Sequence, residues 1–193
     1  MNLENARRRY FLRSTRLGFR SWRDDDLPLA LGLWGDPRVM RFVDSRGQLS
    51  NEDVAQLLRK QINFEREYRV QYWPVFRLED QHHVGCCGLR PYDLGQRLYE
   101  IGVHLRASFW GQGFAQEAMS AVIQYAFERM NLSTLFAGHN PDNKDSERLL
   151  KRLGFQFTHF EFYVATGLEH PSYVLERASS RWAKATCSAS SQA

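Results

Sequence analysis

Cysteine is scarce in this sequence, with only three in 193 residues. Cys86 and Cys87 are adjacent in an apolar segment, and Cys187 lies near the C-terminus. A disulfide framework or a zinc site would need other spacings. The sequence therefore excludes a disulfide-stapled scaffold, predicts no metal site and favours a reducing compartment.

Long apolar runs are also missing. No segment is long and apolar enough to span a bilayer, and residues 1–10 are charged and lack the apolar centre of a signal peptide. We therefore predict a cytoplasmic protein with no membrane partner.

Charge of one sign is not concentrated in any long block. The formal net charge is +4, from 26 basic and 22 acidic residues. Apart from several arginines near the N-terminus, the basic residues are spread along the chain without an aromatic stacking motif. We expect no specific nucleic-acid partner, although a mildly basic chain suits a polyanionic cofactor.

Hydrophobic residues make up 43% of the chain, which suits one domain with a sizeable core. We place this domain at residues 1–177. Residues 178–193 are rich in Ala and Ser with little apolar content, and we expect a disordered tail there. The composition is compatible with a monomer or a homodimer.

The most informative stretch runs from Ser108 to Ala118. Before it, residues 99–105 alternate apolar and polar side chains, which predicts a half-buried strand. After it, apolar residues recur at helical spacing over residues 115–130, which predicts an amphipathic helix. Gly111 and Gly113 allow a tight turn between the two, so that backbone N–H groups at the helix start can converge on an anion.

A Gly-x-Gly turn alone is weak evidence, because many such pairs are ordinary tight turns. The stretch lacks the Gly-Lys-Ser/Thr of a Walker loop and the third glycine of a dinucleotide fingerprint. The surrounding segments predict a single α/β or α+β domain. Its further strands are expected at 16–22, 71–78, 84–89, 133–138, 156–164 and 172–176, and its further helices from residue 24, over 50–68 and over 143–153.

Two motifs resemble the GCN5-related N-acetyltransferase (GNAT) superfamily, in particular its branch of ribosomal-protein N-terminal acetyltransferase-like proteins. Trp110-Gly-Gln-Gly-Phe-Ala115 resembles the coenzyme A loop of the superfamily, Gln/Arg-x-x-Gly-x-Gly/Ala, with Trp110 in place of Gln or Arg. Asn143 to Phe155 matches the pattern Asn-x-x-Ser-x-x-Leu-x-x-x-Leu-Gly-Phe, which is the more specific of the two. The opening segments 14–20 and 36–40 also match, so the resemblance covers roughly residues 13–177.

The resemblance implies an α/β (α+β) fold with a central, mixed and mostly antiparallel sheet. This sheet would have six to seven strands, about four flanking helices, and a splayed middle that admits coenzyme A. The implied cofactor is acetyl-CoA. The residues expected to bind it are Val103 and Leu105 through their strand backbone, Trp110, Gly111, Gln112, Gly113, Phe114 and Ala115 in the loop, and Asn143 and Ser146 in the second motif.

The resemblance also suggests catalytic residues. Ser146 would lie near the sulfur and could protonate the departing thiolate, since the tyrosine that many members carry four residues later is replaced here by Leu150. For the base we consider Glu100 and His104, which alternation places on the same strand face. Each of these three candidates also has an ordinary structural interpretation as a sheet or helix residue. We expect His82 and His83 to be turn residues, and His139 and His170 to be loop residues.

The function we expect is acetyl transfer from acetyl-CoA to a primary amine by direct attack on the thioester, and the acceptor we favour is the α-amine of a protein or peptide N-terminus. Two alternatives remain open from the sequence. One is an acetyltransferase for a small amine such as a polyamine, an amino acid or an antibiotic. The other is an acyl-CoA-binding module that performs no chemistry.

Overall fold

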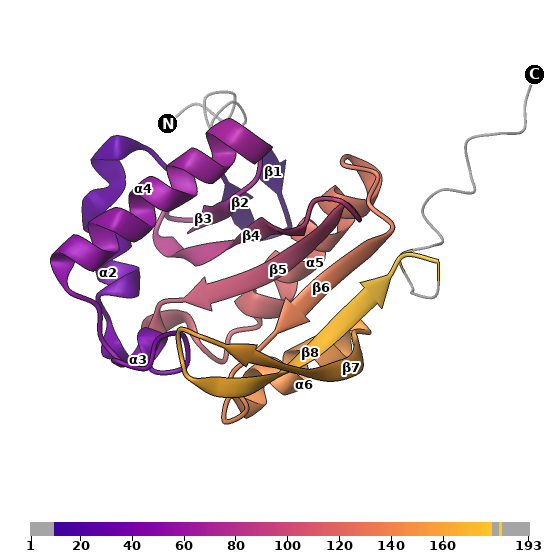
Figure 1. Ribbon diagram of the computed structural model, residues 1–193. Helices are drawn as coiled ribbons and strands as arrows, with labels where there is room; N and C mark the ends of the chain where they lie inside the picture. Colours follow the sequence, from indigo (N-terminus) through magenta and orange to yellow (C-terminus); the bar gives the residue numbers. More distant parts are fainter. Residues whose placement is uncertain (1–9, 179–181, 183–193) are drawn as a thin grey trace, which may run out of the picture.

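The computed structural model describes residues 10–178 and residue 182. Its strands form one sheet in the order β1-β2-β3-β4-β5-β6-β8-β7, with all neighbours antiparallel except the parallel pair of β5 and β6 (Figure 1). The strands are β1 (Leu12–Arg13), β2 (Leu17–Phe19), β3 (Tyr72–Arg77), β4 (His83–Asp93), β5 (Leu98–Leu105), β6 (Thr134–Gly138), β7 (Gln156–Tyr163) and β8 (Leu168–Glu176). The α-helices are α2 (Leu27–Trp34), α3 (Pro37–Met40), α4 (Asn51–Tyr68), α5 (Phe114–Glu128) and α6 (Lys144–Leu153).

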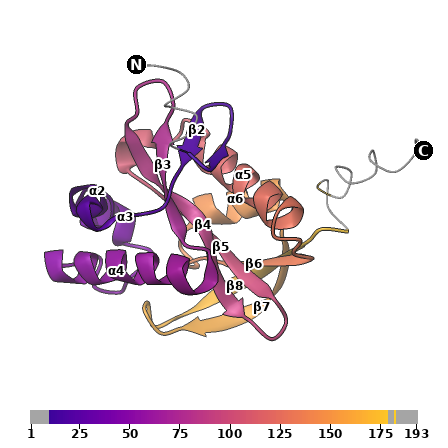
Figure 2. The same cartoon turned by 90° about the horizontal axis from the view of Figure 1, so that it is seen from above.

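Helices cover both faces of this sheet. Figure 2 shows α2, α3 and α4 on one side of the strands and α5 and α6 on the other. Successive side chains of a strand point to opposite faces, so Trp73 and Cys87 pack in the core beneath α5, whereas Tyr72 and Cys86 pack in the core beneath α2 and α4. The two adjacent cysteines are therefore free thiols in separate cores.

The expected mixed, mostly antiparallel sheet is confirmed, with one strand more than we predicted. Strand β1 lies within the arginine-rich lead-in and pairs with β2. The strand expected over residues 16–22 ends at Phe19, because Arg20 turns aside to form a buried ion pair with Asp26, Nη1 to Oδ2 at 2.6 Å. Asp26 stands at the N-cap of α2 but makes no side-chain cap there.

The helix predicted over residues 50–68 has a local cause. The Asp53 N–H donates to the Ser50 hydroxyl at 3.1 Å, and the Ser50 N–H donates to Asp53 Oδ2 at 3.0 Å. This reciprocal capping box fixes the start of α4. The helix ends where Arg69 adopts a left-handed conformation, with a φ of 61°.

Two histidines depart from our prediction. His83 is not in a turn but begins β4, where only 3% of it is exposed. His170 is in β8 rather than a loop. In both cases a hairpin partner extends the strand beyond the segment that alternation marks, since His83 pairs with Phe76 of β3 and His170 with Glu161 of β7.

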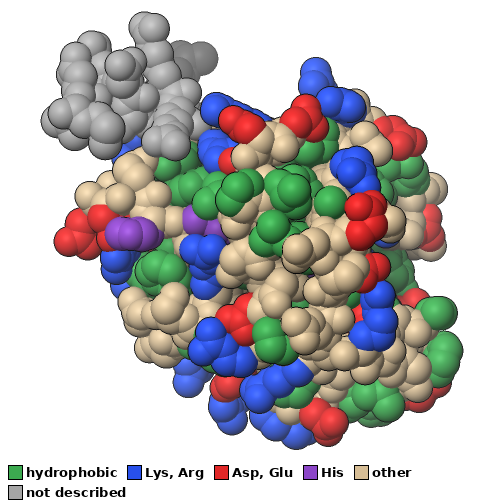
Figure 3. Space-filling model, turned by 90° about the vertical axis from the view of Figure 1, so that its left-hand side faces the viewer, with side chains coloured by type: hydrophobic (Ala, Val, Ile, Leu, Met, Phe, Trp, Pro, Cys, Tyr) green, Lys and Arg blue, Asp and Glu red, His purple; other side chains and the backbone are tan. Residues whose placement is uncertain are grey.

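The predicted tail lies almost entirely outside the described residues. Of its members only Ala178 and Trp182 are described, and Trp182 packs against the core beneath α5. On the face that carries α2, α3 and α4, acidic and basic side chains are interspersed rather than gathered in one stripe (Figure 3). Within the described segments, no helix combines the length and apolar character needed to cross a bilayer.

Candidate active site

The sheet opens between β5 and β6. These strands are paired only at Tyr99 with Leu135 and at Glu100 with Phe136. From Ile101 to Leu105, β5 is paired with β4 on one side, while β6 diverges on the other (Figure 1). The diverging side leaves backbone N–H and C=O groups of β5 facing a cavity of about 810 Å³. The expected splay in the middle of the sheet is thus present.

The glycine turn forms one wall of this cavity. Gly111 and Gly113 have φ values of +73° and +79°, in the left-handed region that favours glycine. Gly113 is the N-cap of α5, so the first-turn N–H groups of this helix, which have no intrahelical partner, are directed at the cavity side. Arg16 fixes the turn, since its Nη1 donates to the Gln112 carbonyl at 3.2 Å and its Nε to Glu117 Oε2 at 2.6 Å.

Most of the predicted loop residues line the cavity, with one exception. Gln112 is not part of the lining, and its Nε2 donates instead to the Ser108 carbonyl at 3.0 Å. Trp110 lies at the cavity and its Nε1 donates to the Leu105 carbonyl at 2.8 Å. The indole therefore ties the end of β5 to the turn. The lining residues from the predicted set are Val103, Leu105, Trp110, Gly111, Gly113, Phe114, Ala115, Asn143 and Ser146.

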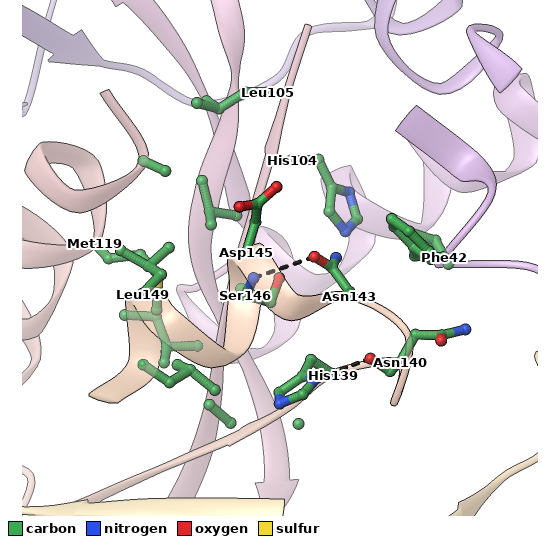
Figure 4. A pocket seen from close by; sticks show the side chains of 18 of the residues that line it. Phe42, His104, Leu105, Met119, His139, Asn140, Asn143, Asp145, Ser146 and Leu149 are labelled. Carbon is green, nitrogen blue, oxygen red and sulfur yellow. Dashed lines mark hydrogen bonds between the residues drawn. The ribbon is translucent and has the colours of Figure 1, made fainter. Parts of the chain in front are cut away.

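The start of α6 forms the facing wall. Asn143 is its N-cap, and its Oδ1 accepts a hydrogen bond from the Ser146 N–H at 3.1 Å (Figure 4). The cap occupies the amide oxygen of Asn143 and the backbone of Ser146, while the Asn143 Nδ2 and the Ser146 hydroxyl remain for a ligand. At its other end α6 stops at Gly154, whose φ is +96°. This is the glycine that we predicted to end the helix.

His104 is placed in the cavity wall, but its hydrogen bonding argues against a role as base. The Trp34 indole N–H, which can only donate, lies 3.1 Å from His104 Nδ1. Nδ1 must therefore be the acceptor, and the neutral ring carries its proton on Nε2. Burial, followed by the nearby Arg90, lowers the His104 pKa to about 4. We therefore correct our prediction: His104 presents a donor rather than a free base nitrogen.

Glu100 is held at the floor of the cavity by two neighbours. Arg90 donates to its Oε2 from Nε at 2.8 Å and from Nη2 at 2.5 Å. The Tyr72 hydroxyl donates to its Oε1 at 3.1 Å. Burial and the Glu100 charge raise the Tyr72 pKa well above its usual value, so Tyr72 remains a neutral donor. The three residues form a fixed polar network on the face covered by α4.

The sequence did not point to the hairpin of β7 and β8 as part of this cavity. Glu161, Tyr163, His170 and Ser172 all line it. Glu161 Oε2 accepts from the Tyr92 hydroxyl at 2.9 Å, and the Ser172 hydroxyl is buried with no hydrogen-bond partner among the described residues. The only available signal was the alternation within residues 156–163. It predicts a strand but cannot show that β8 inserts between β6 and β7.

No group of three His, Cys, Asp or Glu side chains suited to a metal ion occurs among the residues that the structure describes. The site is therefore built from backbone N–H groups at a helix start, an open strand edge, a hydroxyl and paired carboxylates. Such a set suits an anionic group donor held at the helix start.

Comparison with known proteins identifies the class. Residues 16–156 match the family described as "Acetyltransferase (GNAT) domain", and the chain belongs to this family of acetyl-CoA-dependent acetyltransferases. Among curated relatives, the uncharacterized N-acetyltransferase p20 of Bacillus licheniformis is 28% identical over 145 residues, which are 75% of this chain and 82% of p20.

Two solved structures with this fold differ in their acceptors. The ribosomal L7/L12 α-N-protein acetyltransferase RimL in complex with coenzyme A superposes with a TM-score of 0.72 at 17% identity, covering 84% of this chain and 95% of that one. Spermidine N-acetyltransferase from Vibrio cholerae, in complex with coenzyme A and spermine, gives 0.71 at 17% identity, covering 85% and 97%. At this identity the likeness concerns the fold alone.

Proposed function

We propose that this protein transfers the acetyl group of acetyl-CoA to the α-amine of a peptide or protein N-terminus. The observation that carries the proposal is that a single cavity joins the start of α5, the unpaired edge of β5 and the first turn of α6. Each of these three elements offers polar groups that their own secondary structure does not use.

The donor would be bound mainly by backbone. The N–H groups from Gly111 to Ala115 suit the pyrophosphate, because the positive end of the helix dipole lies there. The edge of β5 from Val103 to Leu105 suits the amide groups of the pantetheine arm, which can pair with it as another strand would. The Asn143 Nδ2 is free to add a side-chain donor.

The chemistry requires that the ammonium nitrogen lose two protons, one to a base before attack and one to the leaving thiolate. The neutral amine nitrogen attacks the thioester carbon, the C–S bond breaks with its electron pair on sulfur, and the thiolate takes up the second proton from nitrogen and leaves as the thiol. Ser146 at the first turn of α6 would donate its hydroxyl hydrogen bond to that sulfur. We propose that Glu100 takes the ammonium proton, directly or through a water molecule, because its carboxylate lines the cavity beside the β5 edge.

The acceptor assignment is supported by how the carboxylates of the cavity are used. Each of the three carboxylates that line the cavity has a donor: Arg90 for Glu100, Arg148 for Asp145 and Tyr92 for Glu161. A polyamine is held best by several carboxylates that lack other partners, and these three do not form such a cluster. A single N-terminal ammonium needs only one carboxylate, and the rest of a peptide can pair through its backbone.

A thiol-release assay over a panel of acceptors tests the proposal. We expect short peptides with free N-termini to be acetylated with a higher kcat/KM than spermidine or an aminoglycoside. Blocking the α-amine should stop the reaction even when the peptide contains a lysine. Faster transfer to spermidine would assign the acceptor to the small amines. Binding of acetyl-CoA without transfer to any amine would favour the binding-module alternative.

The Glu100 assignment can be tested separately. Glu100→Gln keeps the size of the side chain but removes the base, and Glu161→Gln is the matched change at the other acceptor-side carboxylate. We expect the first to lower kcat and the second to have the smaller effect. The reverse order would transfer the role of base to Glu161.

A further inference from the structure

The cavity carries more positive than negative charge. Six basic side chains line it against three carboxylates. The basic residues are Arg38, Arg41, Lys60, Arg90, Arg148 and Arg152, and the acidic ones are Glu100, Asp145 and Glu161.

Once the ion pairs are taken into account, the unpaired positive charge of the cavity lies at two places. Each carboxylate already has a donor, and Arg38 is bound to Asp36 outside the cavity at 2.7 Å. Within the described part of the chain, Arg41, Lys60 and Arg152 form no ion pair. Arg152 belongs to α6, on the side where we place the donor. Arg41 and Lys60 belong to the opposite layer, that of α3 and α4 (Figure 2).

Arg41 and Lys60 both lie over aromatic rings that also line the cavity. The Arg41 guanidinium carbon is 4.4 Å from the centre of the Phe42 ring, and Lys60 Nζ is 5.6 Å from that of Phe64. The rings hold the two cations at the cavity without neutralising them. Both residues are exposed, so they are available to an incoming ligand.

We propose that Arg41 and Lys60 select acceptors that carry acidic residues directly after the reacting N-terminal amine. The inference rests on the proposed function, because it concerns the acceptor of the same site. The two cations attract a negatively charged peptide segment and repel a polycation. They act on the approach and placement of the acceptor, and take no part in the transfer of the acetyl group.

Three hexapeptides test this, identical except at positions two and three, which hold Glu-Asp, Gln-Asn or Lys-Lys. Their kcat/KM values are measured with the full-length protein, with Lys60→Glu, and with the double variant Arg41→Glu, Lys60→Glu. Arg59→Glu is the matched control, because Arg59 is the neighbour of Lys60 on α4 but is ion-paired with Glu52 and does not line the cavity. The affinity for acetyl-CoA is measured for every variant.

We expect the unmodified protein to favour the Glu-Asp peptide over the Lys-Lys peptide by about tenfold or more at low salt, as two weakly screened ion pairs allow. The preference should shrink in about 0.5 M salt. The preference should be lost or reversed in the double variant and should remain in Arg59→Glu. The affinity for acetyl-CoA should be unchanged in all of these variants.

Equal use of all three peptides would overturn the inference while the proposed function stands. An equal loss of preference in Arg59→Glu would also overturn it, since overall charge would then explain the effect. Weaker acetyl-CoA binding in the Lys60 and Arg41 variants would assign the two cations to the donor. Acetylation of spermidine but of no peptide would overturn the proposed function itself.

Discussion

We expect His83 to make the stability of the protein sensitive to mild acid. Its ring lies 5.5 Å from that of Trp22 and 5.4 Å from that of Phe76, and neither ring nitrogen has a hydrogen-bond partner among the described residues. Burial, then the positive charge of Arg106, lowers the His83 pKa to about 3. The folded protein therefore holds this histidine neutral where an unfolded chain would protonate it.

The sign and the size of the effect follow from the two pKa values. An unfolded histidine takes up a proton near pH 6.5, whereas folded His83 does so only near pH 3. Well above pH 6.5 neither state is protonated, and His83 does not affect the free energy of unfolding. As the pH falls from about 6.5 to about 3, only the unfolded state gains the proton, so the folded state loses stability. Between pH 7 and pH 5 we expect a loss of about 2 kcal/mol from His83 alone.

Urea unfolding at pH 7 and pH 5 measures this loss. The informative variant is His83→Phe, which keeps a planar ring among Trp22 and Phe76 but cannot titrate, with His83→Leu as a second variant. The unmodified protein should lose about 2 kcal/mol more than either variant between the two pH values. His82→Gln removes the neighbouring exposed histidine, which pairs with Asp80 at 2.6 Å, and is the control for losing a histidine outside the core. If the His83 variants lose as much stability as the unmodified protein, the reasoning is refuted.

Three further predictions concern the proposed donor site. Gly113→Glu should abolish the rise in Tm with acetyl-CoA, a rise that corresponds to about 2.7 kcal/mol at a hundredfold excess over Kd; an unchanged rise would exclude the glycine turn as the anion site. Ser146→Ala should lower kcat more than acetyl-CoA affinity, measured by single-turnover kinetics and calorimetry, because the hydrogen bond to sulfur strengthens as charge develops; equal losses would make Ser146 a positioning residue. Asn143→Ala should cost about 1 kcal/mol of unfolding free energy through the lost α6 cap, whereas Asn143→Ser should retain most of it.

The parts of the fold with local causes could be predicted from the sequence. The start of α4 is marked by the capping box of Ser50 and Asp53. The start of α6 is marked by Asn143 and its end by Gly154. All these contacts are within a few residues, and both helices begin and end as expected. The fold class and the family follow from motifs of the same local kind.

The acceptor half of the site could not be predicted in the same way. It is assembled from the β4–β5 hairpin and the β7–β8 hairpin, which are distant from each other in sequence and meet only through the strand order. The role of His104 was also hidden, because the proton on its ring is placed by Trp34, seventy positions away. Alternation shows the face of a strand but not the partner that the face will meet.

The short pairing between β5 and β6 has a consequence for how such a protein can change over time. A strand edge exposed by divergence of the backbone offers the same N–H and C=O groups whatever side chains the strand carries. Substitutions along it can accumulate while the edge remains usable. The acceptor side, which contains Glu100, Arg90, Tyr72 and the β7–β8 hairpin, depends on side chains, so each substitution there alters what fits. The two ends of the cavity are therefore under different constraints. The β5 edge depends on the backbone conformation, whereas the acceptor side changes with each side chain that is replaced.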